Sequence, residues 1–165
     1  MERMELTEPP VAHTAMLIRK PVSEVFEALV NPAITSRFWF SKGSDRLAVG
    51  TTVRWDWEMY DVSIDVTAQE IEPNKSIVFE WPGYSGPTIV KWNFGVVDGG
   101  TFVDVEESGW SGTGDQLVKF VRESTGGFTW TLAGMKAFLE HGLELNLVAD
   151  RFPKGIGKEL QLDLL

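Results

Sequence analysis

The sequence predicts an α+β fold in which a curved antiparallel sheet wraps round a long C-terminal helix, with two short helices after the first strand. Three patterns support this prediction: apolar residues recur at helical spacing from residue 22, alternate with polar residues between residues 47 and 107, and return to helical spacing between residues 128 and 141. Such a sheet has one apolar face, which the long helix can cover. A twisted sheet wrapped round one helix leaves an apolar pocket wherever the facing side chains do not fill the space.

The N-terminal part is expected to contain one strand and two short helices. Residues 11–19 are mainly apolar and read as a strand that ends before Pro21, a residue suited to the first position of a helix. The apolar positions of that helix are Val22, Val25, Phe26 and Leu29. Asn31 and Pro32 break it, and a second helix is expected over residues 34–40, where the run Phe38-Trp39-Phe40 needs burial.

The middle of the chain is expected to form a meander of antiparallel strands, each with one apolar face. The alternating segments are residues 53–59, 62–69, 77–81, 90–96 and 101–107. The stretch Glu72-Pro73-Asn74-Lys75 supplies one turn, and Asp98-Gly99-Gly100 supplies a hairpin turn.

The C-terminal part is expected to contain a short helix that begins near Asp115 and a separate longer helix over residues 128–141, ended by Gly142. Residues 109–114 are rich in glycine and serine and are interpreted as a mobile loop that gates the pocket. The expected organisation is a flexible N-terminus (residues 1–10), one domain (residues 11–142) and a C-terminal tail docked on it (residues 143–165).

Composition and charge narrow the function classes. The chain has 165 residues, no cysteine and 24 acidic against 15 basic side chains, a net charge of −9. Its long-range field repels phosphate backbones, and no apolar run is long enough to span a membrane, so neither nucleic acid nor a membrane is expected as a partner. The chain has no cysteine, and its first ten residues lack the basic segment and apolar run of a secretory signal. Both observations favour a cytoplasmic location. Seven Trp and ten Phe residues indicate that something apolar is packed or bound.

Several segments resemble the helix-grip (START or SRPBCC) superfamily, and within it the branch of heat-shock-protein ATPase activator homologues. They are Pro21-Val22-Ser23-Glu24-Val25-Phe26-Glu27-Ala28-Leu29, Asn31-Pro32 with Phe38-Trp39-Phe40, Leu47-Ala48-Val49-Gly50, Glu106-Glu107-Ser108-Gly109-Trp110, and residues 130–142. The resemblance covers residues 11–142 and implies a cavity between the long helix and the sheet that accepts lipid-like or polycyclic molecules. For some members it implies binding to a chaperone, and with it a role in the stress response. It brings no invariant catalytic residue. The chain departs from the family pattern in the insertion-like residues 111–127 and in the tail.

A set of mainly aromatic residues is the predicted ligand site. Its members are Trp39, Trp55, Trp57, Phe79, Trp81, Trp92, Phe94, Glu107, Trp110, Phe128, Leu132 and Met135. Taken one at a time, each large apolar member is better explained as core, but several indole N–H groups in one pocket would add orienting polar points to an apolar wall. Glu107 shares a strand face with Val103 and Val105, and if buried there it would act as a general acid or orient a ligand; the simpler alternative is a loop cap in solvent.

No catalytic, metal or cofactor site is predicted. The two histidines, His13 and His141, have no carboxylate at a recognised metal or triad spacing, and no serine lies in a nucleophile-elbow pattern. The predicted function is therefore binding of a small, largely apolar ligand by a monomer or homodimer. Two alternatives remain: a chaperone regulator that binds through its surface, and a cyclase or dehydratase that uses Glu107, Tyr60 or Tyr84 as acid or base.

Overall fold

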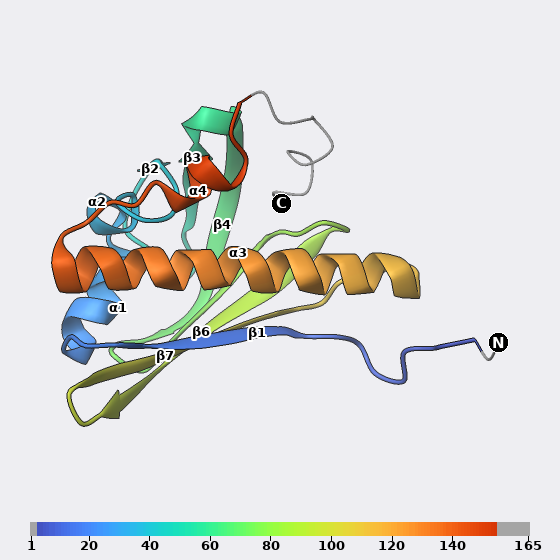
Figure 1. Ribbon diagram of the computed structural model, residues 1–165, viewed down its shortest axis with the longest axis horizontal. Helices are drawn as coiled ribbons and strands as arrows, with labels where there is room; N and C mark the ends of the chain where they lie inside the picture. The colour runs from blue at the N-terminus through green and yellow to red at the C-terminus, as the bar shows by residue number, and fades with distance from the viewer. Residues whose placement is uncertain (1–2, 155–165) are drawn as a thin grey trace.

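The structure is a computed structural model that describes residues 3–154, and it has the predicted α+β architecture (Figure 1). The strands are β1 (Ala12–Ile18), β2 (Lys42–Gly43), β3 (Thr52–Trp57), β4 (Val62–Glu72), β5 (Ser76–Pro82), β6 (Pro87–Val97) and β7 (Gly100–Ser108). The helices are α1 (Val22–Val30), α2 (Pro32–Thr35), α3 (Gly114–His141), α4 (Leu147–Arg151) and the 3₁₀ turn η1 (Glu58–Tyr60). The short β2 was not expected from the sequence, since two residues are too few to show a period.

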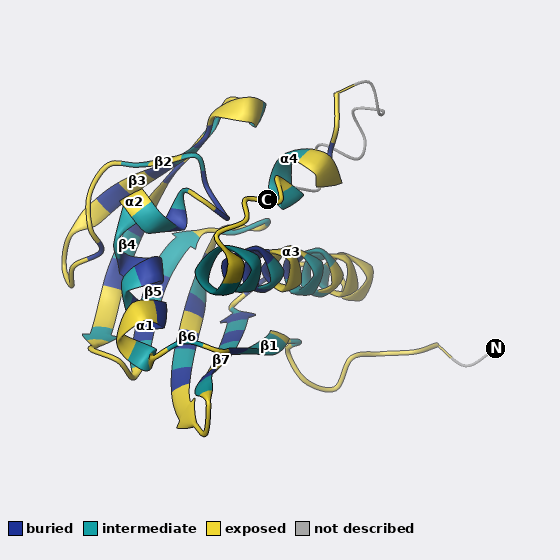
Figure 2. Ribbon diagram, turned by 60° about the vertical axis from the view of Figure 1, so that its left-hand side comes forward, coloured by how far each residue is buried: buried dark blue, intermediate teal, exposed yellow. Residues whose placement is uncertain are grey.

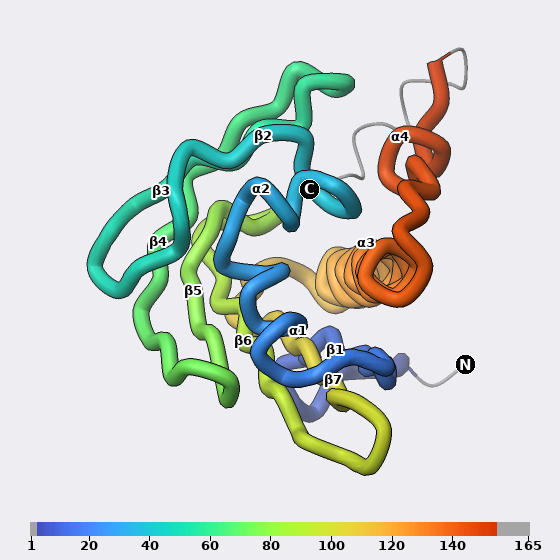
Figure 3. Tube along the Cα trace, turned by 90° about the vertical axis from the view of Figure 1, so that its left-hand side faces the viewer, coloured from blue at the N-terminus to red at the C-terminus, as the bar shows by residue number. Residues whose placement is uncertain are grey.

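The strands form one seven-stranded antiparallel sheet in the order β1-β7-β6-β5-β4-β3-β2. Viewed along α3, the sheet is an arc, and the helices α1, α2 and α3 lie on its concave side (Figure 3). The meander predicted for residues 53–107 is confirmed, including the hairpin turn in which Gly99 takes a φ of 84°. The arc and the helices together enclose the core.

The core follows the alternation read from the sequence, and buried and exposed residues alternate along the strands (Figure 2). The buried apolar residues of β3–β7 are Val53, Trp55, Trp57, Ile64, Val66, Ala68, Ile77, Phe79, Val90, Trp92, Phe94, Val103 and Val105. Two residues depart from the expected pattern. Met59 lies in η1 beyond the end of β3, and Val96 lies near the tip of the β6–β7 hairpin, so both are exposed.

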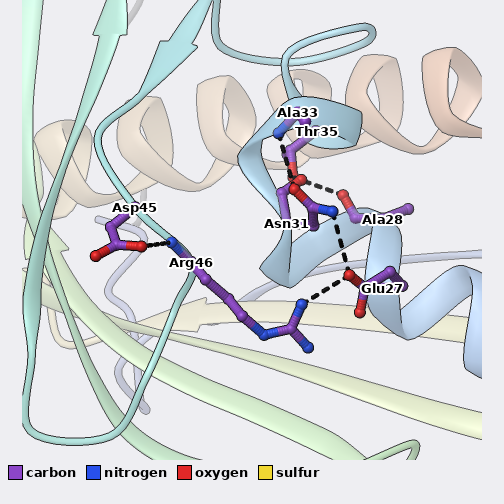
Figure 4. A network of polar contacts seen from close by, with 7 residues as sticks. All are labelled: Glu27, Ala28, Asn31, Ala33, Thr35, Asp45 and Arg46. Carbon is purple, nitrogen blue, oxygen red and sulfur yellow. Dashed lines mark hydrogen bonds and ion pairs between the residues drawn. The ribbon is translucent and has the colours of Figure 1, made fainter.

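A polar network holds α1 and α2 together (Figure 4). Asn31 caps α2 by accepting a hydrogen bond from the Ala33 amide (3.1 Å), and its side-chain nitrogen donates to Glu27 (3.2 Å). Arg46 also donates to Glu27, at 2.7 Å, and this hydrogen bond lowers the pKa of the Glu27 carboxyl. The network therefore ties both helices to the loop before β3.

The second helix is shorter than predicted and lies earlier in the chain. It ends at Thr35, whose hydroxyl donates to the carbonyls of Ala28 (2.5 Å) and Asn31 (3.0 Å). Residues 36–41 continue as turns and loop rather than as the helix expected over residues 34–40. The need to bury Phe38, Trp39 and Phe40 predicted correctly that this segment packs into the core. It could not predict the backbone conformation of the segment.

The two helices expected after residue 115 are one continuous helix, α3, of 28 residues. It begins with a capping box in which Thr113 accepts from the Gln116 amide and the Gln116 side chain accepts from the Thr113 amide. It ends at Gly142, as predicted, in a left-handed conformation with a φ of 66°. The interior pair Gly126 and Gly127 does not break the helix, because each costs only about 1 kcal/mol relative to alanine and packing on the sheet outweighs it.

The C-terminal half of α3 covers the open edge of the sheet at β1. The Lys136 ammonium donates to the Leu17 carbonyl (2.9 Å), and the Glu140 carboxylate accepts from the Arg19 amide (3.1 Å). Unpaired groups on an edge strand invite pairing with another chain, and a covering helix removes that liability. α3 therefore protects the sheet as well as covering its face.

The chain after α3 turns back along the molecule and places α4 beside it (Figure 1). The Tyr60 hydroxyl donates to the Val148 carbonyl at 2.6 Å, and the Phe152 ring is buried and packs edge-on against the Tyr60 ring, with centroids 6.4 Å apart. Residues 155–165 of the predicted tail, and residues 1–2 of the predicted N-terminus, lie outside the described residues.

Candidate functional site

A cavity of about 110 Å³ lies between α3, the sheet and residues 143–152, which contain α4 and are called the α4 segment below. Its lining residues from the sheet and its loops are Trp39, Trp57, Tyr60, Val62, Trp81, Pro82, Gly83, Tyr84 and Glu107. Its lining residues from α3 and the α4 segment are Glu123, Ser124, Gly127, Phe128, Trp130, Thr131, Val148, Arg151 and Phe152. Aromatic side chains thus make up most of the lining on the first side, and Phe128, Trp130 and Phe152 add three more on the second.

Trp39 is the centre of the aromatic wall. It lies in the turn after α2, and its ring centroid is 5.1–6.3 Å from those of its aromatic neighbours. Those neighbours include Trp55, Trp57, Trp81, Trp92 and Phe128. The Trp81 and Phe128 rings stack at 5.8 Å and join the sheet to α3. Ring pairs of this geometry add about 0.5–1.5 kcal/mol each beyond the area they bury, so these contacts stabilise the wall.

Glu107 is a buried carboxylate on this otherwise apolar wall, with only 2% of its surface exposed. One carboxylate oxygen, Oε2, accepts from the Trp81 indole (2.8 Å) and the Thr88 hydroxyl (2.5 Å), and Oε1 accepts from the Ser124 hydroxyl (2.6 Å). All three donors are neutral. Among the described residues, no lysine, arginine or histidine forms an ion pair with Glu107.

The exposed lining residues mark the mouth of the cavity, and they lie at the end of β5 (Pro82), on α3 (Gly127 and Trp130) and in the α4 segment (Arg151). Trp130 is 43% exposed at the mouth, and the Arg151 guanidinium lies 4.5 Å from the centroid of the Phe152 ring. Glu123 adds a carboxylate from α3. The lining at the entrance therefore carries one group of each charge, and Glu123 also forms an ion pair with Arg122 at 3.5 Å.

Tyr60 holds the α4 segment at the mouth by its hydroxyl. Besides the bond to Val148, that hydroxyl lies 3.3 Å from the carbonyls of Ala149 and Phe152. Burial raises the pKa of the Tyr60 phenol above its ordinary value, and the smaller effect of the backbone hydrogen bond at Phe152 opposes this. The phenol is therefore a neutral donor at ordinary pH.

The residues predicted for ligand binding fall into three groups. Trp39, Trp57, Trp81, Glu107 and Phe128 line the cavity. Those in the packed core outside the lining are Trp55, Phe79, Trp92, Phe94, Leu132 and Met135. Trp110 is buried in the loop between β7 and α3, outside the lining, and within the described residues its indole nitrogen has no hydrogen-bond partner. Which of these residues contact a ligand remains a prediction.

Several residues that line the cavity were not predicted from the sequence. Val148, Arg151 and Phe152 belong to the segment after Gly142, where no periodicity indicates which side chains turn inward. Ser124 was missed because the long helix was expected to begin at Phe128. Trp130 was missed because it was expected to project opposite the apolar stripe of that helix. Tyr60 and Tyr84 were proposed only as acid or base candidates, and both line the cavity.

The cavity is small for a ligand site. Pockets for drug-sized molecules measure roughly 300–1,000 Å³, and an engineered cavity of about 150 Å³ holds benzene. A volume of about 110 Å³ therefore suits one ring or a short aliphatic chain. The polycyclic ligands that the resemblance implies would require the mouth to widen.

Residues 109–114, interpreted as a gate, contribute nothing to the lining. The Ser111 amide donates to the Ser85 hydroxyl at 3.0 Å, which joins this loop to the loop between β5 and β6. Within residues 3–154, no three histidine, aspartate or glutamate side chains gather as a set for a metal ion. No helix among the described residues combines the length and apolarity needed to cross a membrane.

Several solved structures have the same fold and align with most of this chain. Protein SSP2350 from Staphylococcus saprophyticus is 30% identical, with a TM-score of 0.73 over 82% of this chain and 96% of that protein. An Aha1 from Colwellia psychrerythraea, described as a dimer, is 20% identical, with a TM-score of 0.69 over 81% of this chain and 98% of that protein. DynU16, described as a putative protein in the dynemicin biosynthetic locus, is 21% identical, with a TM-score of 0.71 over 81% of this chain and 48% of that protein.

A protein-family model assigns the chain to a family. No curated protein matches this chain significantly. The model of the Activator of Hsp90 ATPase homolog 1-like proteins matches residues 19–140, which include the strands that form the aromatic wall and nearly all of α3. The helix-grip resemblance read from the sequence is thereby confirmed, and the chain belongs to the AHSA1 family, the Activator of Hsp90 ATPase homolog 1-like proteins.

Proposed function

We propose that the protein binds a small, largely apolar ligand in the cavity between α3, the sheet and the α4 segment. The observation that supports this most is the combination of an aromatic wall with one buried carboxylate inside a cavity. Ligand sites typically join an apolar lining to a few fixed polar groups that orient the ligand.

Two adjacent glycines of α3 allow a matched test. A Cβ atom added to Gly126 or Gly127 would meet nothing within 4 Å, but only Gly127 lines the cavity. Gly127→Leu should fill the mouth, whereas Gly126→Leu should change the helix in the same way and leave the cavity open. Both replacements raise helix propensity, so folding is expected to survive.

The measurement is ¹⁹F NMR of 4-fluorotoluene titrated with each protein, since this molecule is one ring in size. We expect saturable binding to the wild type and to Gly126→Leu, and at least about tenfold weaker binding to Gly127→Leu. Absence of saturable binding to the wild type, or equal binding to both variants, would contradict the proposal.

Regulation of a chaperone ATPase is a second candidate, supported by the family to which residues 19–140 belong. In this case the outer surface would bind the partner and the interior would serve only as a core. Addition of the wild type to an Hsp90 should then change its rate of ATP hydrolysis, and Gly127→Leu should act like the wild type. An unchanged hydrolysis rate would argue against this candidate.

A further inference from the structure

We propose that the ligand carries a cationic end, a protonated primary amine attached to a single apolar ring, and that its ammonium group binds Glu107. This inference rests on the proposed function, because it names the chemical class bound in the same cavity. It follows from the charge of Glu107, from the number of donors around it and from the rings that line the cavity.

The charge of Glu107 has no partner among the described residues. Burial of an ionised carboxylate costs several kcal/mol unless an opposite charge compensates it. The Trp81, Thr88 and Ser124 donors satisfy hydrogen bonds but bring no positive charge. A cationic ligand would supply the missing charge, and its N–H group would form a hydrogen bond in which both partners are ionised.

The donor count leaves room for one more hydrogen bond. A carboxylate offers about four acceptor sites. Oε2 of Glu107 uses two of them, for Trp81 and Thr88, whereas Oε1 uses one, for Ser124. The remaining site on Oε1 can accept an N–H from a ligand in the cavity, of which Glu107 is a lining residue.

The lining rings suit a cation as well as an apolar body. The face of an aromatic ring attracts ammonium groups, most strongly in tryptophan. Trp39, Trp57 and Trp81 line the same cavity as Glu107. An anionic ligand would instead place its charge near an unpaired buried carboxylate, and the net charge of −9 would disfavour its approach.

The test compares three probes that share a benzyl group on the full-length protein at neutral pH: benzylamine, which is protonated, ethylbenzene, which is its neutral analogue of the same size, and phenylacetate, which is anionic. Binding is followed by the fluorescence of the lining tryptophans and by ligand-observed NMR. We expect benzylamine to bind at least about tenfold more tightly than ethylbenzene, and phenylacetate not to bind. Glu107→Gln should abolish this preference while ethylbenzene still binds, whereas Glu106→Gln, on the opposite face of β7 and outside the lining, should keep it.

Each outcome is decisive. Ethylbenzene binding as tightly as benzylamine to the wild type would overturn the cationic ligand and leave the proposed function standing. Binding of none of the three probes would count against both. If Glu107→Gln fails to fold, the selectivity of the wild type still decides, because that comparison needs no variant.

Discussion

At the residue scale, two buried polar side chains stand out: Thr35, which stabilises the junction of α1 and α2, and Glu107, which lines the cavity. The period of two places Glu107 on the same strand face as Val103 and Val105, so its burial could be anticipated from the sequence as one of two alternatives. Its partners could not be anticipated. Thr88 reaches it through the pairing of β6 with β7, and Ser124 reaches it because α3 begins at Gly114 rather than at the predicted Phe128.

Thr35→Val should destabilise the protein by about 1–3 kcal/mol, because it leaves the buried Ala28 carbonyl without its side-chain donor while keeping the side-chain shape. Urea unfolding followed by circular dichroism measures the change. The control is Thr52→Val at an exposed position of β3, where the Thr52 hydroxyl is hydrogen-bonded to that of Thr67, and it should alter stability by less than about 0.5 kcal/mol. Equal effects of both variants would show that the Thr35 hydroxyl does not stabilise the α1–α2 junction.

At the scale of elements, strands were predicted better than helices. A strand needs only alternation, and each strand from β3 to β7 shows it along its own sequence. The length of α3 depends instead on whether the Gly126-Gly127 pair breaks the helix, and this is decided by packing from both sides. Ser124 and Phe128 are buried on either side of the pair, and local propensity does not contain that information.

The attachment of α3 to β1 should depend on pH through Glu140. Burial of this carboxyl favours its neutral form, but the hydrogen bonds from the Lys136 ammonium and the Arg19 amide outweigh burial, so the pKa of Glu140 is lowered. A lowered pKa in the folded state stabilises the protein above the ordinary pKa of the group, and this contribution is lost as the pH falls through the folded pKa.

Glu140→Gln should therefore lower the free energy of unfolding at pH 7, and its difference from the wild type should shrink as the pH falls below about 4.5. Urea unfolding of both proteins at several pH values measures this difference. Glu144→Gln is the control, since its ion pair with Arg37 is exposed and 3.7 Å long and should contribute little at any pH. A difference that stays constant from pH 7 to pH 3 would contradict the role given to the Glu140 charge.

At the scale of the whole molecule, the cavity joins segments that lie far apart in the sequence. The turn after α2, the sheet, the middle of α3 and the α4 segment each supply part of the wall. The aromatic strand faces and the covering helix could be predicted because each shows its own period. The mouth could not, because residues 143–152 show no period and their place is set by contacts such as the one from Tyr60 to Val148.

The α4 segment should control access to the cavity, and Tyr60→Phe isolates its main polar attachment. Loss of the hydroxyl removes the hydrogen bond to Val148 but keeps the ring against Phe152, so the protein should stay folded and lose about 0.5–1.5 kcal/mol. Hydrogen exchange of residues 146–152 should accelerate, whereas exchange in β6 should not change.

In the wild type, the raised pKa of Tyr60 predicts that this attachment is complete below about pH 10 and weakens as the pH rises towards the folded pKa. Tyr60→Phe should lack that alkaline response, and an equal acceleration at high pH in both proteins would show that another group holds the segment.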